Sequence, residues 1–533
     1  MPTLIIDRRE VTVSRGARLL DAAEALGIAI PTLCCSRDLP HFTSCMLCVV
    51  RDVKADRLLP ACSAPARDGM AVETDSPPVI EARRMALELL LSEHVGDCEG
   101  PCRRICPAAM NIPLMIRQIR AGQLRDAVVT VKRDIVLPAI LGRICPAPCE
   151  RGCRRGAVDA PLSICLLKRG VADADLARAD PWMPGVPPET GRRIAVIGAG
   201  PAGLAAAAHL RLLGHGCAVY DLHEHPGGTL RTAVPEDRLP RSVIDAEVDW
   251  IRNLGVAFRM RTHIGRDVSL AELRKDHAAI VVATGTLDPA GARDLFEADV
   301  THRGLRVDPH TCRTSVPDLF AGGAAIGDCK MAVRALANGK AMAVSVDQYL
   351  RGLPVTGPKD RFSSIIGKLL DGEAAGFLAE ATGDARVEPR VPRDGLSADE
   401  AARESGRCLH CDCRKAETCR LRDFSDTYRA HAGHFKGAER DRFEQIRQHA
   451  EVIYEPGKCI KCGLCIRLTE REREPLGLTF IGRGFSVRVA VPFNETLSAG
   501  LTKTAAACVR ICPTGALAFP RGDALDPRPE RDG

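Results

Sequence analysis

Residues 193–228 read RIAVIGAGPAGLAAAAHLRLLGHGCAVYDLHEHPGG, and this stretch decides the fold of the middle of the chain. The apolar run 194–197 is typical of a buried parallel strand, and an Ala/Leu-rich helix is expected after the turn that follows. In that turn, Gly198 permits a tight reversal, Gly200 lets a pyrophosphate approach the backbone, and Gly203 lets the helix pack on the strand. The phosphates would lie at the helix N-terminus. The stretch therefore predicts a dinucleotide-binding fold.

A second strand is expected over 217–220, and it ends in Asp221, 18 residues after Gly203. A carboxylate at this place can accept a hydrogen bond from a ribose hydroxyl. A glycine fingerprint alone is weak evidence, but here a strand, a helix and an acid accompany it. The alternative is a fold of the same α/β type with no nucleotide in it.

Further segments extend the pattern, namely VYDLHEHPGG (219–228), RLP (238–240), VVATG (281–285) and SVPDLFAGG (315–323). Together they resemble the flavin domain of the glutamate synthase small subunit and its relatives. The resemblance implies bound FAD, with the glycines on the pyrophosphate and the acid on the adenosine ribose. It implies a set of cofactor-binding residues: Gly198, Gly200, Gly203, Asp221, Gly227, Gly228, Gly322 and Gly323.

The chain departs from this family in two places. Relatives carry a second domain, for NADPH, between the ATG and SVPxxFAGG segments, whereas only 29 residues separate Gly285 from Ser315 here. Because a βαβ unit with its flanking strands needs more chain than that, we expect no separate nicotinamide domain. Relatives also place an aspartate after FAGG, where this chain has Ala324. Asp328, one turn further on, is the expected substitute.

Composition limits the classes of function. A chain of 533 residues with 45% hydrophobic content can bury several cores, and a net charge of +6 without a basic block argues against nucleic-acid binding. The sequence contains no run of 18 apolar residues and no signal peptide. We therefore expect a cytoplasmic protein without a membrane span. In a reducing compartment, 24 cysteines indicate metal ligands rather than disulfides.

The cysteine groups and the Pro- and Gly-rich stretches indicate a multidomain protein of the α+β and α/β classes. We expect a β-grasp 2Fe-2S domain (1–78), an α-helical 4Fe-4S domain (79–170), a linker (171–191), a Rossmann-like FAD domain (192–352), a second linker (353–405), a Cys-rich segment (406–444) and a C-terminal ferredoxin-like 4Fe-4S domain (445–525). Within the second linker, one short helical piece is expected around residues 365–370.

The first domain offers four thiolates in one loop-rich region: Cys34, Cys45, Cys48 and Cys62. Four such ligands suit a [2Fe-2S] cluster, with zinc as the alternative. The spacing, with the flanking IPTLC and PACSAP, resembles the N-terminal domain of the complex I large iron–sulfur subunit and of iron-only hydrogenases. Cys35 adjoins Cys34 and is expected to be a spectator, with the alternative that Cys35 is the ligand in its place.

The second domain has one histidine and seven cysteines: His94, Cys98, Cys102, Cys106, Cys145, Cys149, Cys153 and Cys165. The segments CPAAMNIP and GRICPAPCERGC resemble the helical domain of the glutamate synthase small subunit and of dihydropyrimidine dehydrogenase, which implies two [4Fe-4S] clusters. By that family's interleaving, His94, Cys98, Cys102 and Cys153 would hold one cluster, and Cys106, Cys145, Cys149 and Cys165 the other. Cys165 has no cysteine counterpart in those relatives, and His94 stands at the family's first cysteine.

Two more groups follow. Cys408, Cys411, Cys413 and Cys419 match no known cluster spacing, so zinc, a further cluster and free thiols all stay open. The last domain has the ferredoxin run CxxCxxC with a displaced fourth ligand: Cys459, Cys462, Cys465 and Cys512. This arrangement predicts one [4Fe-4S] cluster, with Cys508 left out. The sequence thus predicts about three [4Fe-4S] clusters and one [2Fe-2S] cluster beside FAD.

The predicted cofactors imply an enzyme, an FAD- and Fe-S-dependent oxidoreductase that works as an electron-transfer subunit. We expect a hetero-oligomer with another redox protein or a catalytic subunit. No Ser/His/Asp set or pair of carboxylates stands out, so no catalytic side chain is predicted. Two alternatives are an NAD(P)H-dependent reductase of the glutamate synthase type and an electron-wiring module without flavin.

Overall fold

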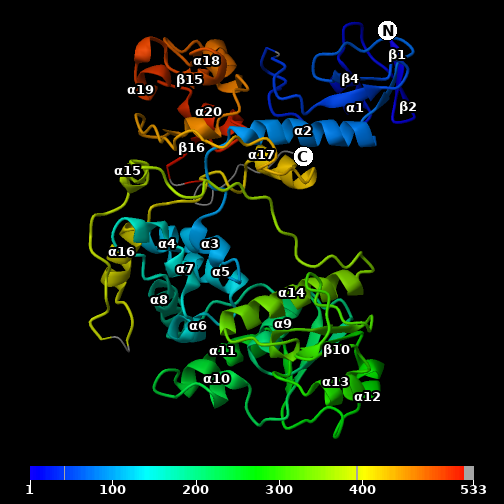
Figure 1. Ribbon diagram of the computed structural model, residues 1–533, viewed down its shortest axis with the longest axis vertical. Coiled ribbons are helices and arrows are strands. Elements are labelled where there is room, and N and C mark those ends of the chain that lie inside the picture. Colours follow the sequence, from blue (N-terminus) through cyan, green and yellow to red (C-terminus); the bar gives the residue numbers. More distant parts are fainter. Residues whose placement is uncertain (41, 392–393, 521, 523–533) are drawn as a thin grey trace. The chain divides into compact units, whose positions relative to one another are not determined.

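The computed structural model describes residues 1–40, 42–391, 394–520 and 522 (Figure 1). The chain divides into two compact units. The first comprises Met1–Gly100, Arg361–Glu380 and Cys411–Gly533, and the second comprises Pro101–Asp360 and Ala381–His410. Among the described residues, no helix combines the length and the apolar character that crossing a membrane requires.

The first unit begins with a small mixed sheet against one helix. Its elements are β1 (Thr3–Ile6), β2 (Arg9–Thr12), α1 (Leu19–Ala25), β3 (Val49–Asp52), β4 (Arg57–Pro60) and β5 (Ala71–Glu73), and the strand order is β2-β1-β5-β3-β4. β1 pairs antiparallel with β2 and parallel with β5. Leu4 and Ile6 alternate with exposed positions and are buried with Leu19 of α1. The β-grasp part of the predicted fold is confirmed.

The rest of the first unit shares one core with the helix that follows this sheet. That helix is α2 (Pro77–Ser92), and the other elements are α17 (Arg420–Thr427), β13 (Ile453–Tyr454), α18 (Leu464–Arg471), β14 (Thr479–Ile481), β15 (Arg488–Ala490), α19 (Leu497–Gly500), α20 (Ala505–Ile511) and β16 (Leu517–Ala518). Leu87 and Leu91 of α2 are buried together with Leu421 of α17 and Leu464 of α18. β13 pairs antiparallel with β16.

The segment Arg361–Glu380 joins the first unit without the helix expected around residues 365–370. That prediction is wrong, because the backbone of this segment is used by side chains from an earlier loop. Ser364 donates its N–H to Sγ of Cys98 at 3.3 Å, and Ile366 donates its N–H to Oδ1 of Asp97 at 2.9 Å. The segment therefore runs extended here, and a short helix, α15 (Ala374–Leu378), follows.

The second unit begins with a helical domain. It contains α3 (Pro101–Ile105), α4 (Ile112–Arg120), α5 (Leu124–Asp134), α6 (Pro138–Ile144), α7 (Pro148–Arg151) and α8 (Ile164–Leu176), and α16 (Ala398–Gly406) packs on α4 and α8. Glu404 of α16 accepts the backbone N–H of Ser163 at 2.8 Å. The stretch expected to be a second linker therefore ends in a helix that belongs to the domain's core.

The remainder of the second unit is a parallel sheet with helices on both faces. The strands are β6 (Arg193–Ile197), β7 (Gly216–Tyr220), β8 (Ala257–Arg259), β9 (Ala279–Val282) and β12 (Leu319–Ala321), in the order β12-β9-β6-β7-β8. The helices are α9 (Pro201–Leu212), α10 (Thr229–Thr232), α11 (Arg241–Asn253), α12 (Leu270–Asp276), α13 (Pro289–Phe296) and α14 (Ala332–Leu350). This is the Rossmann-like fold that the sequence predicts.

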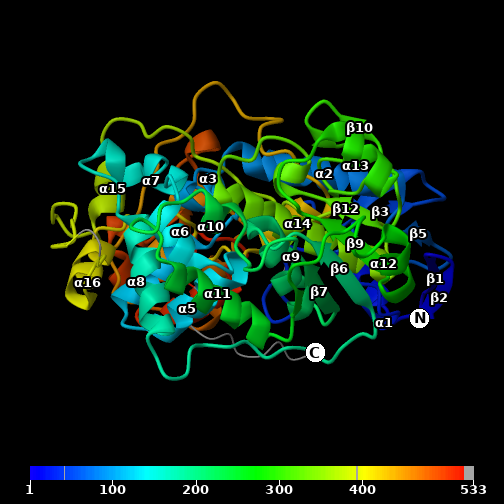
Figure 2. The same cartoon turned by 90° about the horizontal axis from the view of Figure 1, so that it is seen from below.

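Side chains of the central strands alternate between the two faces of this sheet. Ile194 and Val196 face α9 and α14, whereas Ala195 and Ile197 face α12 and α13. Figure 2 shows α9 and α14 side by side next to the strands. Their close approach depends on Gly339, where an added Cβ would stand 2.4 Å from the carbonyl oxygen of Ala202.

Residues 286–314, where relatives carry their NADPH domain, form α13 and a two-strand hairpin. The strands are β10 (Val300–Thr301) and β11 (Gly304–Leu305), paired antiparallel. Phe296 of α13 and Leu305 of β11 are buried against the sheet. The segment thus covers one face of the sheet.

Candidate functional site

A cavity of about 760 Å³ opens at the carboxyl ends of the strands in the second unit. Gly198 and Gly200 of the turn after β6 line it, together with Asp221 after β7 and Gly285 after β9. Residues 330–332 at the start of α14 also line it. This is where ligands bind in open α/β sheets, and the size suits a dinucleotide.

The glycine turn has the geometry that only glycine permits. Gly198 has φ +109°, and a Cβ there would stand 2.3 Å from the carbonyl oxygen of Ala283. A Cβ on Gly203 would stand 1.9 Å from the carbonyl oxygen of Gly198. The turn is therefore packed as a phosphate-binding turn requires, with the N-terminus of α9 facing the cavity.

Asp221 already holds part of this turn in place. Its Oδ2 accepts the backbone N–H of Ala199 at 2.7 Å, and its Oδ1 accepts the backbone N–H of His223 at 2.8 Å. A carboxylate has further lone pairs, so these bonds leave room for a ribose hydroxyl. The acid thus acts on the turn as well as on any nucleotide.

Some of the other expected cofactor-binding residues line the cavity, and others pack beneath its wall. Gly228, with φ +51°, lines the cavity, and a Cβ there would stand 2.9 Å from Cα of Gly200. Gly227 donates its N–H to the carbonyl oxygen of Ala199 at 2.8 Å and so stabilises the glycine turn. Gly323 lines the cavity, whereas Gly322 packs under α14 against Met342. Ala324 and Asp328 both line the cavity, so the expected substitute stands at the same wall.

Three thiols of the first domain lie in the loop between α1 and β3, and the fourth, that of Cys62, follows β4. A hydrogen bond between the side chains of Cys34 and Cys45 lowers the pKa of Cys34, and a similar bond to Cys62 raises the pKa of Cys48. The N–H of Ser44 points at Sγ of Cys34 at 3.5 Å. The Arg18 guanidinium lies 4.0 Å from the sulfur of Cys35. The donor set fits a [2Fe-2S] cluster on the four expected residues.

In the helical domain, four thiols surround one buried ammonium group. Burial lowers the pKa of Lys168, but the nearby thiols more than offset this and raise it; they are Cys165, Cys145, Cys149 and Cys106. Nζ of Lys168 lies 4.0 Å from Sγ of Cys165. The structure thus brings together the four residues expected to share one cluster, Cys165 included. This cation was not predicted from the sequence, because the burial of Lys168 follows from the fold.

The residues expected to share the other cluster fall into different units. His94 and Cys98 belong to the first unit, and Cys102 and Cys153 belong to the second, where they pack against the helical core. Cys98 instead lies near Cys413 and Cys419. Burial raises the pKa of Cys98 and the charge of Cys413 adds to this, whereas burial and the charges of Cys413 and Cys98 raise the pKa of Cys419. Cys408 lies in the second unit and packs against the same core as Cys102 and Cys153.

The last thiol group surrounds a small cavity in the first unit. Cys459, Cys462, Cys465 and Cys512 line it with Tyr454, and the N–H of Lys461 points at Sγ of Cys459 at 3.4 Å. Cys508 is fully buried outside the cavity lining and directs its thiol toward the carbonyl of Cys465. The charge of Cys34 is among those that raise the pKa of Cys462, after burial and Cys512. The first and last thiol groups are therefore neighbours.

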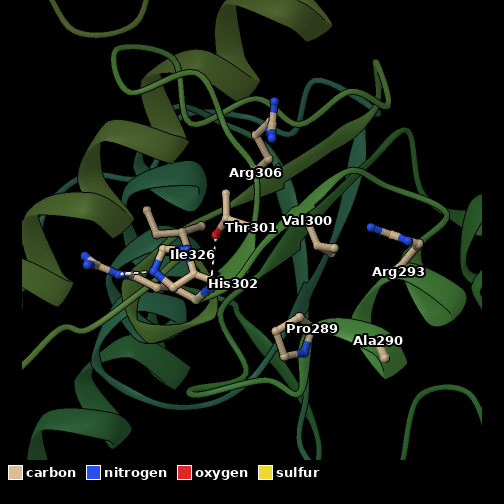
Figure 3. A pocket seen from close by; sticks show the side chains of 9 residues that line it. Pro289, Ala290, Arg293, Val300, Thr301, His302, Arg306 and Ile326 are labelled. Carbon is tan, nitrogen blue, oxygen red and sulfur yellow. Dashed lines mark hydrogen bonds between the residues drawn. The ribbon is translucent and has the colours of Figure 1, made fainter.

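A second, open pocket of about 850 Å³ lies beside the β10–β11 hairpin (Figure 3). Four of its lining residues carry basic side chains: Arg293, His302, Arg303 and Arg306. Nε of Arg303 lies 3.0 Å from Nε2 of His302. Ile326 lines this pocket, whereas Ala324 and Asp328 line the cavity at the carboxyl ends of the strands, so one short segment separates the two.

Within the described part of the chain, no three His, Cys, Asp or Glu side chains converge as a site for a single metal ion.

Comparison with known proteins assigns three parts of the chain. Family models match residues 2–77 as a 2Fe-2S iron-sulfur cluster binding domain, residues 92–179 as dihydropyrimidine dehydrogenase domain II with a 4Fe-4S cluster, and residues 196–276 as an NAD(P)-binding Rossmann-like domain. The domains are those of iron–sulfur oxidoreductase subunits.

Three relatives make the likeness specific. The chain is 36% identical over 207 residues to the NADP(+)-dependent formate dehydrogenase subunit beta of Moorella thermoacetica, covering 35% of this chain and 29% of that one. It is 36% identical to the NAD-dependent dihydropyrimidine dehydrogenase subunit PreT of Escherichia coli K12 (39% and 52%) and to the glutamate synthase [NADPH] small chain of Mycobacterium tuberculosis (36% and 39%). The chain spans about half or less of these relatives. The expected resemblance to the glutamate synthase and dihydropyrimidine dehydrogenase proteins is confirmed.

Proposed function

We propose that this chain is an iron–sulfur flavoprotein subunit that passes electrons between FAD and a series of clusters, to or from a partner redox protein. The cofactors proposed are FAD in the 760 Å³ cavity, a [2Fe-2S] cluster in the first domain, and [4Fe-4S] clusters at the cysteine groups. A flavin exchanges electrons singly or in pairs and a cluster exchanges one at a time, so together they connect two-electron and one-electron chemistry.

One observation carries the proposal. Ile144 and Pro146 both line the flavin-sized cavity, and Cys145 stands between them. The cysteine group around Lys168 is therefore next to the cavity within one unit. Such an arrangement favours direct transfer between a nucleotide-bound flavin and a cluster, and the chain's own role is to hold both and exclude water between them.

The buried surroundings support cluster binding rather than inert packing. Cys106, Cys149 and Cys165 are buried. Clustered cysteines that serve as metal ligands fit a reducing compartment, and we propose a cytoplasmic location. The relatives that are named as subunits favour a hetero-oligomer, with a redox protein or catalytic subunit as partner.

The test is cofactor content. Protein purified without oxygen should contain flavin near one equivalent, with iron and sulfide in equal amounts and zinc near zero, and the reduced protein should show paramagnetic signals of both cluster types. Iron–sulfur signals without flavin would favour the wiring module instead. Zinc in place of iron would contradict the proposal.

A second candidate function is an NAD(P)H-dependent reductase in which the pyridine nucleotide enters without a domain of its own. The basic pocket beside β10–β11 favours it, because guanidinium groups pair with nucleotide phosphates. Anaerobic titration with NADPH distinguishes the two. Rapid bleaching of the flavin in wild-type protein, weakened in Arg303→Glu but not in Arg266→Glu, would favour the reductase.

A further inference from the structure

Three thiols from two distant segments meet in the first unit. Cys98 follows α2, and Cys413 and Cys419 flank the turn before α17. The N–H of Cys413 donates to the carbonyl of Cys98 at 3.2 Å, which joins the two segments directly. Cys419 is the N-cap residue of α17, and Thr418 donates its N–H to the carbonyl of Lys415 at 3.2 Å, which closes the turn. All three side chains are buried.

Backbone groups lie close to two of these sulfurs. Gly515 faces Cys413, and a Cβ at this glycine would stand 2.3 Å from Sγ of Cys413. The backbone N–H of Ser364 points at Sγ of Cys98 at 3.3 Å. Hydrogen bonds from backbone N–H groups to sulfur are a feature of iron–sulfur sites and tune their potentials.

Buried cations surround the three sulfurs. Lys458 is 4% exposed and pairs with Glu455, and its side chain lies against Gly515 together with Sγ of Cys413. Arg422 is 1% exposed and pairs with Glu99 at 2.8 Å, next to Cys98. Lys415 is 4% exposed and donates to the carbonyls of Val509 and Cys512. Nearby cations favour the thiolate form of a cysteine, which is the form that binds an iron–sulfur cluster.

A histidine, His94, lies near Lys458 and therefore near these sulfurs. Nδ1 of His94 is buried and has no hydrogen-bond partner among the described residues. The side chain of Lys458 connects it to the sulfurs, since it lies against Gly96, two residues after His94, and against Gly515, which faces Cys413. Val95 donates its N–H to the carbonyl of Gly457 at 2.7 Å, which fixes His94 beside the loop that carries Lys458.

We propose that His94, Cys98, Cys413 and Cys419 bind one [4Fe-4S] cluster, with a histidine as the fourth ligand. This grouping replaces the one expected from the sequence, which joined His94 and Cys98 to Cys102 and Cys153. It also assigns two of the four cysteines at 408–419 to a cluster rather than to zinc. The site goes beyond the flavin and the cysteine group next to it, and it can be tested separately from them.

The first test measures iron, sulfide, zinc and flavin in anaerobically purified full-length variants. Cys413→Ala and Cys419→Ala should each lose about four irons and four sulfides per chain. Flavin content should stay at the wild-type level in both. The matched control is Cys312→Ala, which removes a buried thiol from the flavin domain and should lose no iron. Unchanged iron in both variants, or loss of one zinc instead of iron, would overturn the proposal.

The second test begins with wild-type protein, so its main result does not depend on the folding of a variant. Pulsed paramagnetic resonance on reduced wild-type protein labelled with ¹⁵N-histidine should detect one nitrogen coupled directly to a cluster. His94→Cys should abolish this coupling and keep the iron, because a thiolate can replace the imidazole. Absence of any histidine coupling in the wild-type protein would overturn the role of His94, even with the flavin and the other clusters in place.

Discussion

Glu247 of α11 accepts the backbone N–H of Ile140 of α6 at 2.9 Å, and its second oxygen accepts the N–H of Ala139 at 2.8 Å. The carboxyl group thereby caps α6 from the flavin domain. Ile144, which ends α6, lines the flavin-sized cavity, and Cys145 follows directly. One buried acid thus fixes the distance between the two proposed redox sites of the second unit.

This acid gives the second unit a pH dependence. Burial raises the pKa of Glu247 to about 7, against the hydrogen bonds from Ile140 and Ala139, which lower it. The folded state therefore holds the proton more tightly than the unfolded chain. The stabilisation is complete below the ordinary carboxyl pKa and is lost as the pH rises through about 7, with a total effect of up to about 3 kcal/mol. Urea denaturation followed by flavin fluorescence should show a falling midpoint between pH 5 and pH 8.

Glu247→Gln should remove most of that slope, because an amide does not titrate. The exposed Asp237→Asn serves as control and should keep the wild-type slope. Equal slopes in wild-type protein and Glu247→Gln would contradict the assignment.

Lys168 is predicted to set the potential of the cluster next to the flavin. Its buried ammonium lies 4.0 Å from Sγ of Cys165, so it stabilises the more negative, reduced state. Lys168→Met should lower the midpoint potential by on the order of 50 to 100 mV, for a unit charge several Å from the cluster. Lys168→Arg should restore it. Potentiometric titration monitored by paramagnetic resonance measures the shift, and an unchanged potential in Lys168→Met would argue against a cluster at this group.

Gly203 should tolerate no side chain. In Gly203→Ala the new Cβ would stand 1.9 Å from the carbonyl oxygen of Gly198, so the turn must move away from the nucleotide. We expect a loss of stability of about 1 to 3 kcal/mol and purification without flavin. Gly185→Ala is the matched control, because a Cβ there meets nothing within 4 Å. Flavin content by absorbance checks both variants, and full flavin in Gly203→Ala would refute the proposed binding mode.

Comparing variants of Cys512 and Cys508 tests which of the two residues binds the last cluster. Cys512 lines the cavity with three other cysteines, whereas Cys508 directs its thiol toward Thr504 and the carbonyl of Cys465. Cys512→Ala should lose about four irons and Cys508→Ala none. The iron content of the two variants tests this prediction. Loss of iron in Cys508→Ala but not in Cys512→Ala would identify Cys508 as the ligand instead.

The glycine turn, Asp221 and the ferredoxin run could be predicted because their residues lie close together in the sequence and act on one local structure. The meeting of Cys98 with Cys413 and Cys419 could not, because spacing says nothing about segments more than 300 residues apart. The helix expected around residues 365–370 failed for a related reason: Ser364 and Ile366 give their N–H groups to Cys98 and Asp97. Lys168 and Lys458 read as surface residues in the sequence, and only the fold shows that they are buried beside thiols.

Light-driven reduction of the flavin in anaerobic protein, followed by rapid absorbance spectroscopy, tests the central proposal most directly. The proximity of the cavity to Cys145 predicts that reduced flavin reoxidises at the same rate at which cluster absorbance bleaches. A flavin that stays reduced while the clusters stay oxidised would contradict transfer between them.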